Sequence, residues 1–150
     1  MFRGSFPHTI DDKGRVAIPG KWRDLLSADD DNRLVLTRFM VDRARCLDAY
    51  PYGEWLRFEE SMMKQRRFSP AVLKFESYYI ARAHDCQIDK QGRILVPPQL
   101  REYAGLERDV VLAGVLTKFR LWSRDGWEQV DQAAEQAMID DPGFLEGLDL

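Results

Sequence analysis

Residues 10–23 of the chain read IDDKGRVAIPGKWR, and residues 88–101 read IDKQGRILVPPQLR. Six of these fourteen aligned positions are identical, namely an Ile, an Asp, a Gly, an Arg, a Pro and a second Arg. An internal repeat of this kind indicates two copies of one small structural unit. We therefore interpret residues 1–75 and 76–150 as duplicated halves, each consisting of a sheet segment followed by a helix.

The similarity between the halves continues downstream of this stretch. Residues 33–37, RLVLT, resemble residues 109–113, DVVLA, and Gly53-Glu54-Trp55 has its counterpart in Asp125-Gly126-Trp127. Two separate domains of about 50 residues each would be only marginally stable. We therefore expect the two halves to share one hydrophobic core.

The composition is that of an ordinary soluble globular protein, with 45% hydrophobic and 31% charged residues. No segment approaches the ~18 consecutive apolar residues of a membrane-spanning helix, and the first residues lack the apolar stretch of a secretory signal. Cys46 and Cys86 are too few for a disulfide framework and fit a reducing compartment. We therefore expect a cytoplasmic protein.

The net charge of −3 is unevenly distributed along the chain. Residues 125–150 contain eight acidic side chains and no Lys or Arg, whereas residues 1–124 contain 22 basic and 17 acidic side chains, a net charge of +5. Residues 61–75 contain four basic side chains and no acid. A solvated surface is the simplest interpretation of each cluster, but the overall charge does not exclude a nucleic-acid partner.

Turn residues and hydrophobic spacing predict a chain with strands in both halves, a helical middle and a helical end. We expect strands at Phe6–Ile10, Val16–Ile18, Leu34–Thr37, Cys46–Ala49, Val110–Leu116 and Phe119–Trp122. Prolines and a following glycine predict short helices at Lys21–Leu26 and Gln99–Ala104. Hydrophobic periodicity predicts a helical hairpin, followed later by a C-terminal helix with Val130, Ala134 and Ala137 facing inward. These longer helices are expected at Tyr52–Arg66, at Pro70–Ala83 with Ser69 as its cap, and at Trp127–Ile139.

Residues suited to catalysis or metal binding are few. His8 and His84 are the only histidines, and His84-Asp85-Cys86 resembles half of a metal site. No second half occurs at the spacing of zinc ligands. The sequence contains no nucleophile motif, phosphate loop or dinucleotide fingerprint. We therefore expect no catalytic residue, no metal and no cofactor.

The turn at residues 11–15 recurs at residues 89–93 with its Asp, Gly and Arg in the same places. In a structural interpretation, the Asp caps the turn, the Gly adopts a left-handed conformation and the Arg pairs with an acid. A functional interpretation competes evenly for Lys13, Arg15 and Arg93, because an exposed arginine can bind phosphates or guanine. A two-stranded ribbon also fits the major groove of DNA.

The chain resembles the MraZ family over essentially its whole length. The stretches that carry this resemblance are Phe2-Arg3-Gly4, the two turns at 11–15 and 89–93, Val110–Leu116, and Phe119, Leu121 and Trp122. The resemblance implies an α+β, mainly β fold of duplicated AbrB-like swapped-hairpin β-barrel units, packed as an intramolecular pair. A helical hairpin lies between the units, and a C-terminal helix follows them. The implied division is into two SpoVT/AbrB-type DNA-binding domains at 5–53 and 82–125, a helical connector at 54–81, and an acidic C-terminal helix and tail at 126–150.

The resemblance also implies a function. It indicates a bacterial transcriptional regulator, associated with the nucleoid, that represses the division and cell-wall gene cluster beginning with its own gene. Such a regulator binds repeated boxes in promoter double-stranded DNA as a ring-shaped homo-oligomer. The implied DNA-binding residues are Arg3, Lys13, Arg15, Gln91 and Arg93, and the residues that shape the turns are Asp11, Gly14, Asp89 and Gly92. The two turns need not contribute equally, because Gln91 stands where the first copy has Lys13.

Two other classes of function compete with this interpretation. An enzyme on a duplicated barrel would need a convergent polar pocket, for which the sequence offers no nucleophile–base pair. A non-enzymatic assembly scaffold or antitoxin-like protein-binding module is the other alternative, because swapped-hairpin domains also occur in antitoxins. Antitoxins usually add a disordered toxin-binding tail, whereas this C-terminal segment is predicted to be helical as far as Ile139.

Overall fold

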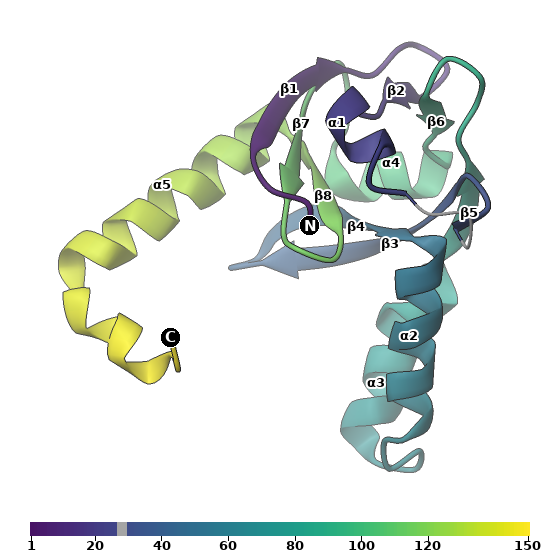
Figure 1. Ribbon diagram of the computed structural model, residues 1–150. Helices are drawn as coiled ribbons and strands as arrows, with labels where there is room; N and C mark the ends of the chain where they lie inside the picture. The colour runs from purple at the N-terminus through teal and green to yellow at the C-terminus, as the bar shows by residue number, and fades with distance from the viewer. Residues whose placement is uncertain (27–29) are drawn as a thin grey trace.

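The computed structural model describes residues 1–26 and 30–150 as an α+β fold, mostly antiparallel sheet with helices around it (Figure 1). The strands are β1 (Ser5–Thr9), β2 (Arg15–Ala17), β3 (Arg33–Val41), β4 (Ala44–Pro51), β5 (His84–Gln87), β6 (Arg93–Leu95), β7 (Asp109–Gly114) and β8 (Phe119–Ser123). The helices are α1 (Gly20–Arg23), α2 (Tyr52–Met63), α3 (Pro70–Tyr78), α4 (Pro98–Ala104) and α5 (Arg124–Asp140), with short 3₁₀ helices η2 (Ile80–Arg82) and η3 (Pro142–Gly147). The predicted fold class, α+β and mainly β, is confirmed.

The two halves of the chain are interleaved in the main sheet. Six strands form this sheet in the order β1-β7-β8-β4-β3-β5, so that β1 pairs with β7, β4 with β8 and β5 with β3. β2 pairs with β6 in a separate two-stranded sheet. The β3–β4 hairpin followed by α2 has its counterpart in the β7–β8 hairpin followed by α5. The sequence similarity downstream of the two turns, between residues 33–55 and 109–127, therefore corresponds to a hairpin and a following helix in each half.

The prediction of closed β-barrel units is wrong for the part of the chain that the structure describes. β1 and β5 are the two edges of the six-stranded sheet, and no ladder joins them. β2 and β6 have three residues each, because Pro19 and Pro97, which lack a backbone N–H, follow closely and stand immediately before α1 and α4. These two strands are therefore too short to continue the main sheet and pair with each other.

One hydrophobic core draws on both halves of the chain. Val16 and Ile18 from the first repeat and Ile94 and Val96 from the second are each at most 3% exposed and belong to one cluster. Trp22 of α1 lies in the same cluster. The expectation of a shared core is confirmed, and burial of this common apolar surface holds the two repeats together.

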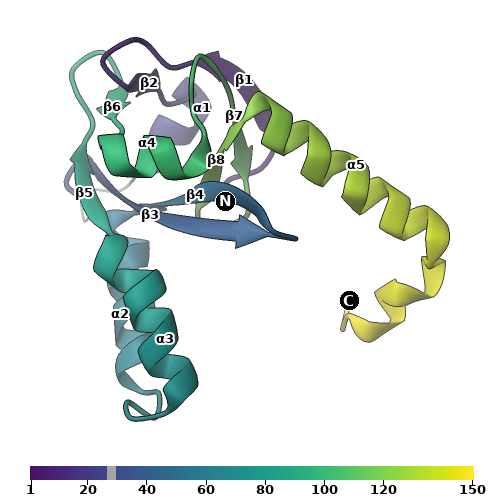
Figure 2. The ribbon, with the colours of Figure 1, turned by 180° about the vertical axis from the view of Figure 1, so that it is seen from behind.

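The helical hairpin predicted between the halves is present, but its helices are shorter than predicted. α2 ends at Met63, and α3 ends at Tyr78. α3 stops where the carbonyls of Tyr78 and Tyr79 accept hydrogen bonds from side chains of β3, at 2.7 Å from Nε of Arg38 and 2.5 Å from Oγ1 of Thr37. Figures 1 and 2 show the hairpin projecting from one side of the sheet.

The predicted C-terminal helix is confirmed as α5, whose N-terminus is capped by the Ser123 hydroxyl accepting from the N–H of Gly126 at 3.0 Å. Trp127 and Val130 pack against the sheet. The expectation that Ala134 and Ala137 also face inward is wrong, because the helix leaves the sheet after its first turns and both side chains are exposed (Figure 2). Within residues 1–26 and 30–150, no helix is long and apolar enough to cross a membrane.

Candidate nucleic-acid interface

The first Asp-x-x-x-Arg turn is organised around the carboxylate of Asp11. Its Oδ1 accepts hydrogen bonds from the backbone N–H of Lys13 at 3.0 Å and of Arg15 at 2.9 Å. Its Oδ2 accepts from Nε of Arg15 at 2.7 Å. Gly14 has a φ of 87°, a left-handed conformation that favours glycine. One carboxylate thus holds both the backbone of the turn and the arginine side chain.

The second turn repeats this geometry. Oδ1 of Asp89 accepts from the backbone N–H of Gln91 and of Arg93, each at 2.9 Å, and Oδ2 accepts from Nε of Arg93 at 3.1 Å. Gly92 has a φ of 77°. The Asp, Gly and Arg that are identical in the two copies are therefore the residues that make the same contacts in both.

The glycine of each turn is hydrogen-bonded to the residue that follows the short strand of the other repeat. The carbonyl of Gly92 accepts from the N–H of Ile18 at 2.8 Å, and the carbonyl of Gly14 accepts from the N–H of Val96 at 2.8 Å. Between these bonds, β2 and β6 run antiparallel with Val16 opposite Ile94. The two turns consequently flank the short β2–β6 ladder, one at each of its ends, on the side of the molecule where β2 and β6 lie in Figures 1 and 2.

Sequence reasoning missed two further arginines of this region. A Cβ placed on Gly14 would lie 2.7 Å from Cζ of Arg101, and one placed on Gly92 would lie 2.6 Å from Cζ of Arg23. The last arginine of each repeat thus lies over the glycine of the other repeat. The sequence did mark these arginines, because Arg23 and Arg101 occupy one of the six identical positions of the repeat. The spacing could not show that each arginine contacts the glycine of the other repeat.

The arginines of the turns keep part of their hydrogen-bonding capacity unused. The side chains of Arg15 and Arg93 are 35% and 30% exposed, and each bonds its aspartate through Nε. Their Nη groups have no hydrogen bond to the described residues 1–26 and 30–150. The neighbouring Lys13 and Gln91 are exposed. This end of the molecule therefore offers charged donors to a ligand.

Arg3 is not brought to the turns. It precedes β1, whereas the first turn follows β1, and the five residues of that strand span roughly 16 Å. The backbone of Arg3 is held at the other end, where its carbonyl accepts from Nε1 of Trp22 at 3.3 Å. The structure thus groups four of the five predicted DNA-binding residues and separates Arg3 from them.

The histidine–cysteine segment lies elsewhere, because His84-Asp85-Cys86 belongs to β5 at the edge of the main sheet. Among the described residues, no group of three or more His, Cys, Asp or Glu side chains is placed to hold a metal ion. Burial raises the pKa of the Cys46 and Cys86 thiols to about 12. Both thiols are therefore protonated at neutral pH and poorly suited to act as nucleophiles.

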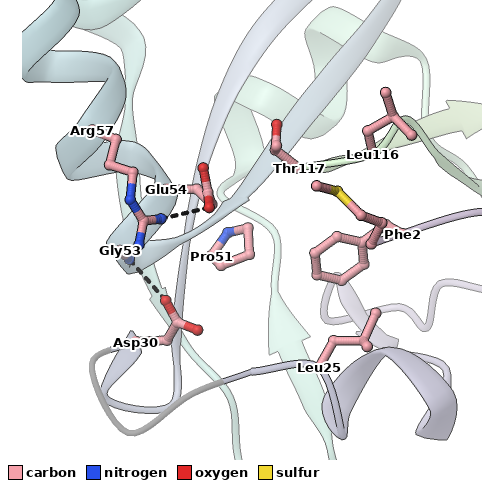
Figure 3. Close-up of a pocket in the computed structure, with 10 residues that line it drawn as sticks. Phe2, Leu25, Asp30, Pro51, Gly53, Glu54, Arg57, Leu116 and Thr117 are labelled. Atoms are coloured by element: carbon pink, nitrogen blue, oxygen red, sulfur yellow. Dashed lines mark hydrogen bonds and ion pairs between the residues drawn. The ribbon is translucent and has the colours of Figure 1, made fainter.

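A cavity of about 300 Å³ between the N-terminus and α2 contains none of the turn residues (Figure 3). Its ordered contacts are an Asp30 carboxylate that accepts from the N–H of Gly53 at 2.8 Å and an ion pair between Arg57 and Glu54 at 2.5 Å. Because these polar groups are used in contacts within the protein, the cavity is a weaker candidate for a binding site than the two turns.

The carboxylates of the turns make the site sensitive to acid. The pKa of Asp11 and of Asp89 lies below the usual 3.8, first because each accepts a backbone N–H, from Arg15 and Arg93 respectively, and also because of the arginine side chain. A depressed pKa in the folded state means that the ionised form stabilises the turn. We expect this stabilisation to be complete above the unfolded pKa and lost as the pH falls through the lower folded pKa.

Amide chemical shifts of Arg15 and Arg93, followed by NMR from neutral pH into acid, test this expectation. Both should titrate with a midpoint below 3.8. Asp11→Asn is the matched control, because it removes the titrating group from the first turn only. A midpoint at or above the usual carboxyl pKa in the native protein would contradict the hydrogen-bonded arrangement.

Alanine at Gly92 is expected to destabilise the fold by about 1–2 kcal/mol, because a side chain is strained in the left-handed conformation. Gly105 is a matched control, since it also has a positive φ, 64°, but open space around it. Both variants should lose similar stability in urea unfolding. Only Gly92→Ala should displace the Arg23 guanidinium, seen as a shift of its Nε–H NMR signal. An unmoved signal would mean that Arg23 does not lie over the second turn.

Comparison with known families agrees with the doubled geometry of the turns. The family described as "MraZ protein, putative antitoxin-like" matches residues 1–72 and 79–142. The chain belongs to the MraZ family. The two matched segments begin 78 residues apart, which is the offset of the internal repeat.

Proteins named transcriptional regulator MraZ are similar to this MraZ-family chain over most of its length. The protein of Thioalkalivibrio sulfidiphilus is 40% identical over 147 residues, covering 93% of this chain and 96% of that one. The protein of Syntrophobacter fumaroxidans is 40% identical over 152 residues, covering 99% and 97%. That of Lachnoclostridium phytofermentans is 42% identical over 128 residues, covering 85% of each. None of these names is that of an enzyme, in agreement with the prediction from the sequence.

Proposed function

We propose that this MraZ-family protein is a transcriptional regulator that binds double-stranded DNA through its two Asp-x-x-x-Arg turns. The observation that carries this proposal is the exchange of hydrogen bonds between Gly14 and Val96 and between Gly92 and Ile18, which fixes two equivalent arginine-bearing turns at the two ends of one short ladder. The names of the relatives, which describe transcriptional regulators, support the same role.

The chemistry of the turns suits DNA. A guanidinium held through Nε by an aspartate is oriented before the ligand arrives, and its Nη groups can bind a phosphate or the edge of a guanine. Lys13 adds a charge beside Arg15, and Gln91 adds an amide beside Arg93. Arg101 has a buried Nε without a hydrogen-bond partner in the described chain, so its charge adds to the local positive potential.

The regulator that we propose is a nucleoid-associated repressor, located in the cytoplasm. It acts on the division and cell-wall gene cluster that includes its own gene. One chain presents only two turns, and each turn supplies few contacts. A ring of several chains would present many turns to repeated promoter boxes, and simultaneous engagement can raise the apparent affinity by ~10²–10⁴. A ring with many turns would therefore bind DNA with repeated boxes more tightly than DNA with a single box.

Two surfaces that the single chain leaves uncovered support a ring. The segment after Val130 carries most of the eight acidic side chains of residues 125–150, and its exposed apolar residues include Met138, Ile139, Phe144 and Leu148. The tip of the α2–α3 hairpin is basic and carries Phe68, which is 93% exposed. Opposite charges on different ends of one molecule favour a head-to-tail contact, which generates a ring when the rotation between neighbouring chains closes.

Charge reversal tests this contact. Lys64→Glu/Arg66→Glu should lower the number of subunits measured by native mass spectrometry, and Asp140→Lys/Asp141→Lys should do the same. Combining all four changes should restore the native number, because opposite charges again face each other. Failure of the combination to restore assembly would place the contact elsewhere without bearing on DNA binding.

The DNA-binding proposal is tested by fluorescence anisotropy with DNA from upstream of the protein's own gene, against a scrambled sequence, over a series of salt concentrations. Tighter binding to the upstream DNA that weakens steadily with salt is the expected result, because phosphate contacts release counterions. Equal binding to both sequences would indicate a nonspecific coating role. No binding at low salt would overturn the proposal.

A protein-binding module is the second candidate. The family description includes the term antitoxin-like, and the acidic arm formed by α5 and η3 is an exposed surface that a basic protein partner could cover. This arm is helical rather than irregular, with α5 extending to Asp140. If the DNA titration shows no binding, co-expression with the genes adjacent to this one would identify a protein partner.

A further inference from the structure

A second surface of the molecule carries positive charge that the chain does not neutralise. Arg38 of β3, Arg45 of β4 and Arg82 of η2 line a cavity of about 380 Å³ against one side of α4. The remaining lining residues come from α4 and are Gln99, Leu100, Glu102 and Tyr103. None of the three arginines forms an ion pair with any residue in 1–26 or 30–150. Three cations therefore face a cavity in which, among the residues that the structure describes, Glu102 supplies the only carboxylate.

Two of these guanidinium groups are held in place by a pair of tyrosines. Nε of Arg38 donates to the carbonyl of Tyr78 at 2.7 Å, and its Cζ lies 4.4 Å from the centre of the Tyr78 ring. Cζ of Arg45 lies 4.9 Å from the centre of the Tyr103 ring. The two tyrosine hydroxyls are hydrogen-bonded to each other at 2.6 Å. These two guanidinium groups are thus ordered without a ligand, which lowers the entropy cost of binding one.

The size and donors of the cavity define the chemistry of a ligand. Arginine binds phosphate oxygens in pairs, and Arg38 uses only one of its five N–H groups on Tyr78. The volume lies in the range of sites for whole small molecules rather than for single ions. Glu102 and Gln99 supply acceptors suited to the hydroxyl groups of a sugar. The combination fits a small molecule with two linked phosphates, as in pyrophosphate or a nucleoside diphosphate.

We propose that this cavity is a binding site for a small diphosphate. We further propose that occupancy of the cavity changes the affinity of the two turns for DNA. The link is α4. Gln99 and Tyr103 are each two residues from Arg101, so they point about 200° away from it around the helix. One face of α4 therefore lines the cavity, while the opposite face places Arg101 over Gly14 of the first turn. A ligand that repositions α4 also moves a charge at the DNA-binding end.

Isothermal titration calorimetry on the full chain tests the site without DNA. Pyrophosphate and ADP should each bind at one site per chain, and sulfate should bind at least roughly tenfold more weakly because it carries no second phosphate-like group. Tighter binding of ADP than of pyrophosphate would support recognition of the sugar by Gln99 and Glu102. Equal binding would support recognition of the diphosphate alone. Absence of binding by both would overturn the proposal.

A pair of double variants distinguishes specific binding in the cavity from general electrostatic attraction of a phosphate to the protein. Arg45→Gln/Arg82→Gln should weaken binding of both probes by roughly tenfold or more, because it removes two charge-assisted contacts. The matched control is Arg43→Gln/Arg108→Gln, which removes the same charge from exposed positions outside the cavity. Equal weakening by the control would overturn the proposal. Circular dichroism checks that both variants are folded.

The proposed effect of the ligand on DNA affinity rests on the proposed DNA-binding function, whereas the proposed ligand site does not. In the presence of saturating ADP, the affinity of the native protein for its upstream DNA should change at least threefold, and that of Arg45→Gln/Arg82→Gln should not. An unchanged affinity in the native protein would overturn the coupling. If the variant binds DNA poorly without any ligand, the arginines belong to the DNA surface, and the coupling through α4 is overturned. If the native protein binds no DNA, the calorimetry still decides the site.

Discussion

Replacing Arg15 and Arg93 together by alanine is expected to abolish specific binding to the upstream DNA. Each guanidinium can make a bidentate contact with a phosphate or a guanine, worth about 1–3 kcal/mol. Loss of one turn's arginine should therefore lower the affinity by roughly 10- to 100-fold. Loss of both removes the contact from every turn of an oligomer, so the gain from multiple attachment disappears as well. Fluorescence anisotropy at fixed salt measures the effect.

The same double variant should leave the fold and the assembly intact. The pairs Arg15–Asp11 and Arg93–Asp89 are partly exposed, so solvent screens them and their loss should cost the fold little. Arg3→Ala is the charge-matched control for each single variant, because it also removes one arginine but Arg3 lies beyond the other end of β1. The affinity of Arg3→Ala for DNA should differ from the native affinity by less than about threefold. Native affinity in the double variant, with assembly unchanged, would mean that the turns serve the fold and not DNA binding.

Asp48→Ala is expected to destabilise the protein by roughly 3–5 kcal/mol, the largest effect on folding that we predict. Asp48 is 1% exposed, and its carboxylate accepts from Nε of Arg120 at 2.9 Å and from the hydroxyl of Tyr79. The Tyr79 hydroxyl also bonds that of Tyr50 at 2.6 Å. Removing the carboxylate leaves a mostly buried guanidinium without its counter-charge and a buried hydroxyl without its acceptor. This network joins β4, β8 and the end of α3, so its loss affects both the sheet and the helical hairpin.

Urea unfolding followed by circular dichroism measures the loss, which corresponds to a fall in melting temperature of roughly 10 °C. The matched control is Asp85→Ala, which breaks an ion pair with Arg33 at 3.3 Å in which the aspartate is 59% exposed. That variant should change the free energy of unfolding by less than about 1 kcal/mol. Equal effects of the two substitutions would show that burial does not distinguish the two aspartates.

Local structure was the part of the fold that could be predicted. α4 begins at Pro98 and ends at Ala104 before Gly105, whose φ is 64°, as the proline and the glycine indicated. β5 was not predicted, because a short edge strand with mostly exposed residues depends on its pairing with β3. The course of α5 was predicted only in part. Its periodicity indicates a helix, but the point at which the helix leaves the sheet is set by where the sheet ends.

The sequence by itself determined the duplication, the two Asp-x-x-x-Arg turns and the family, because these depend on residue identities and on contacts within about four residues. Asp11 and Arg15 meet in this way within one turn. Only the tertiary structure decided that β2 pairs with β6 and that Arg23 and Arg101 each lie over the other repeat's glycine. Those contacts join segments about half a chain apart, and they form because burying one shared core stabilises the interleaved arrangement of the two repeats.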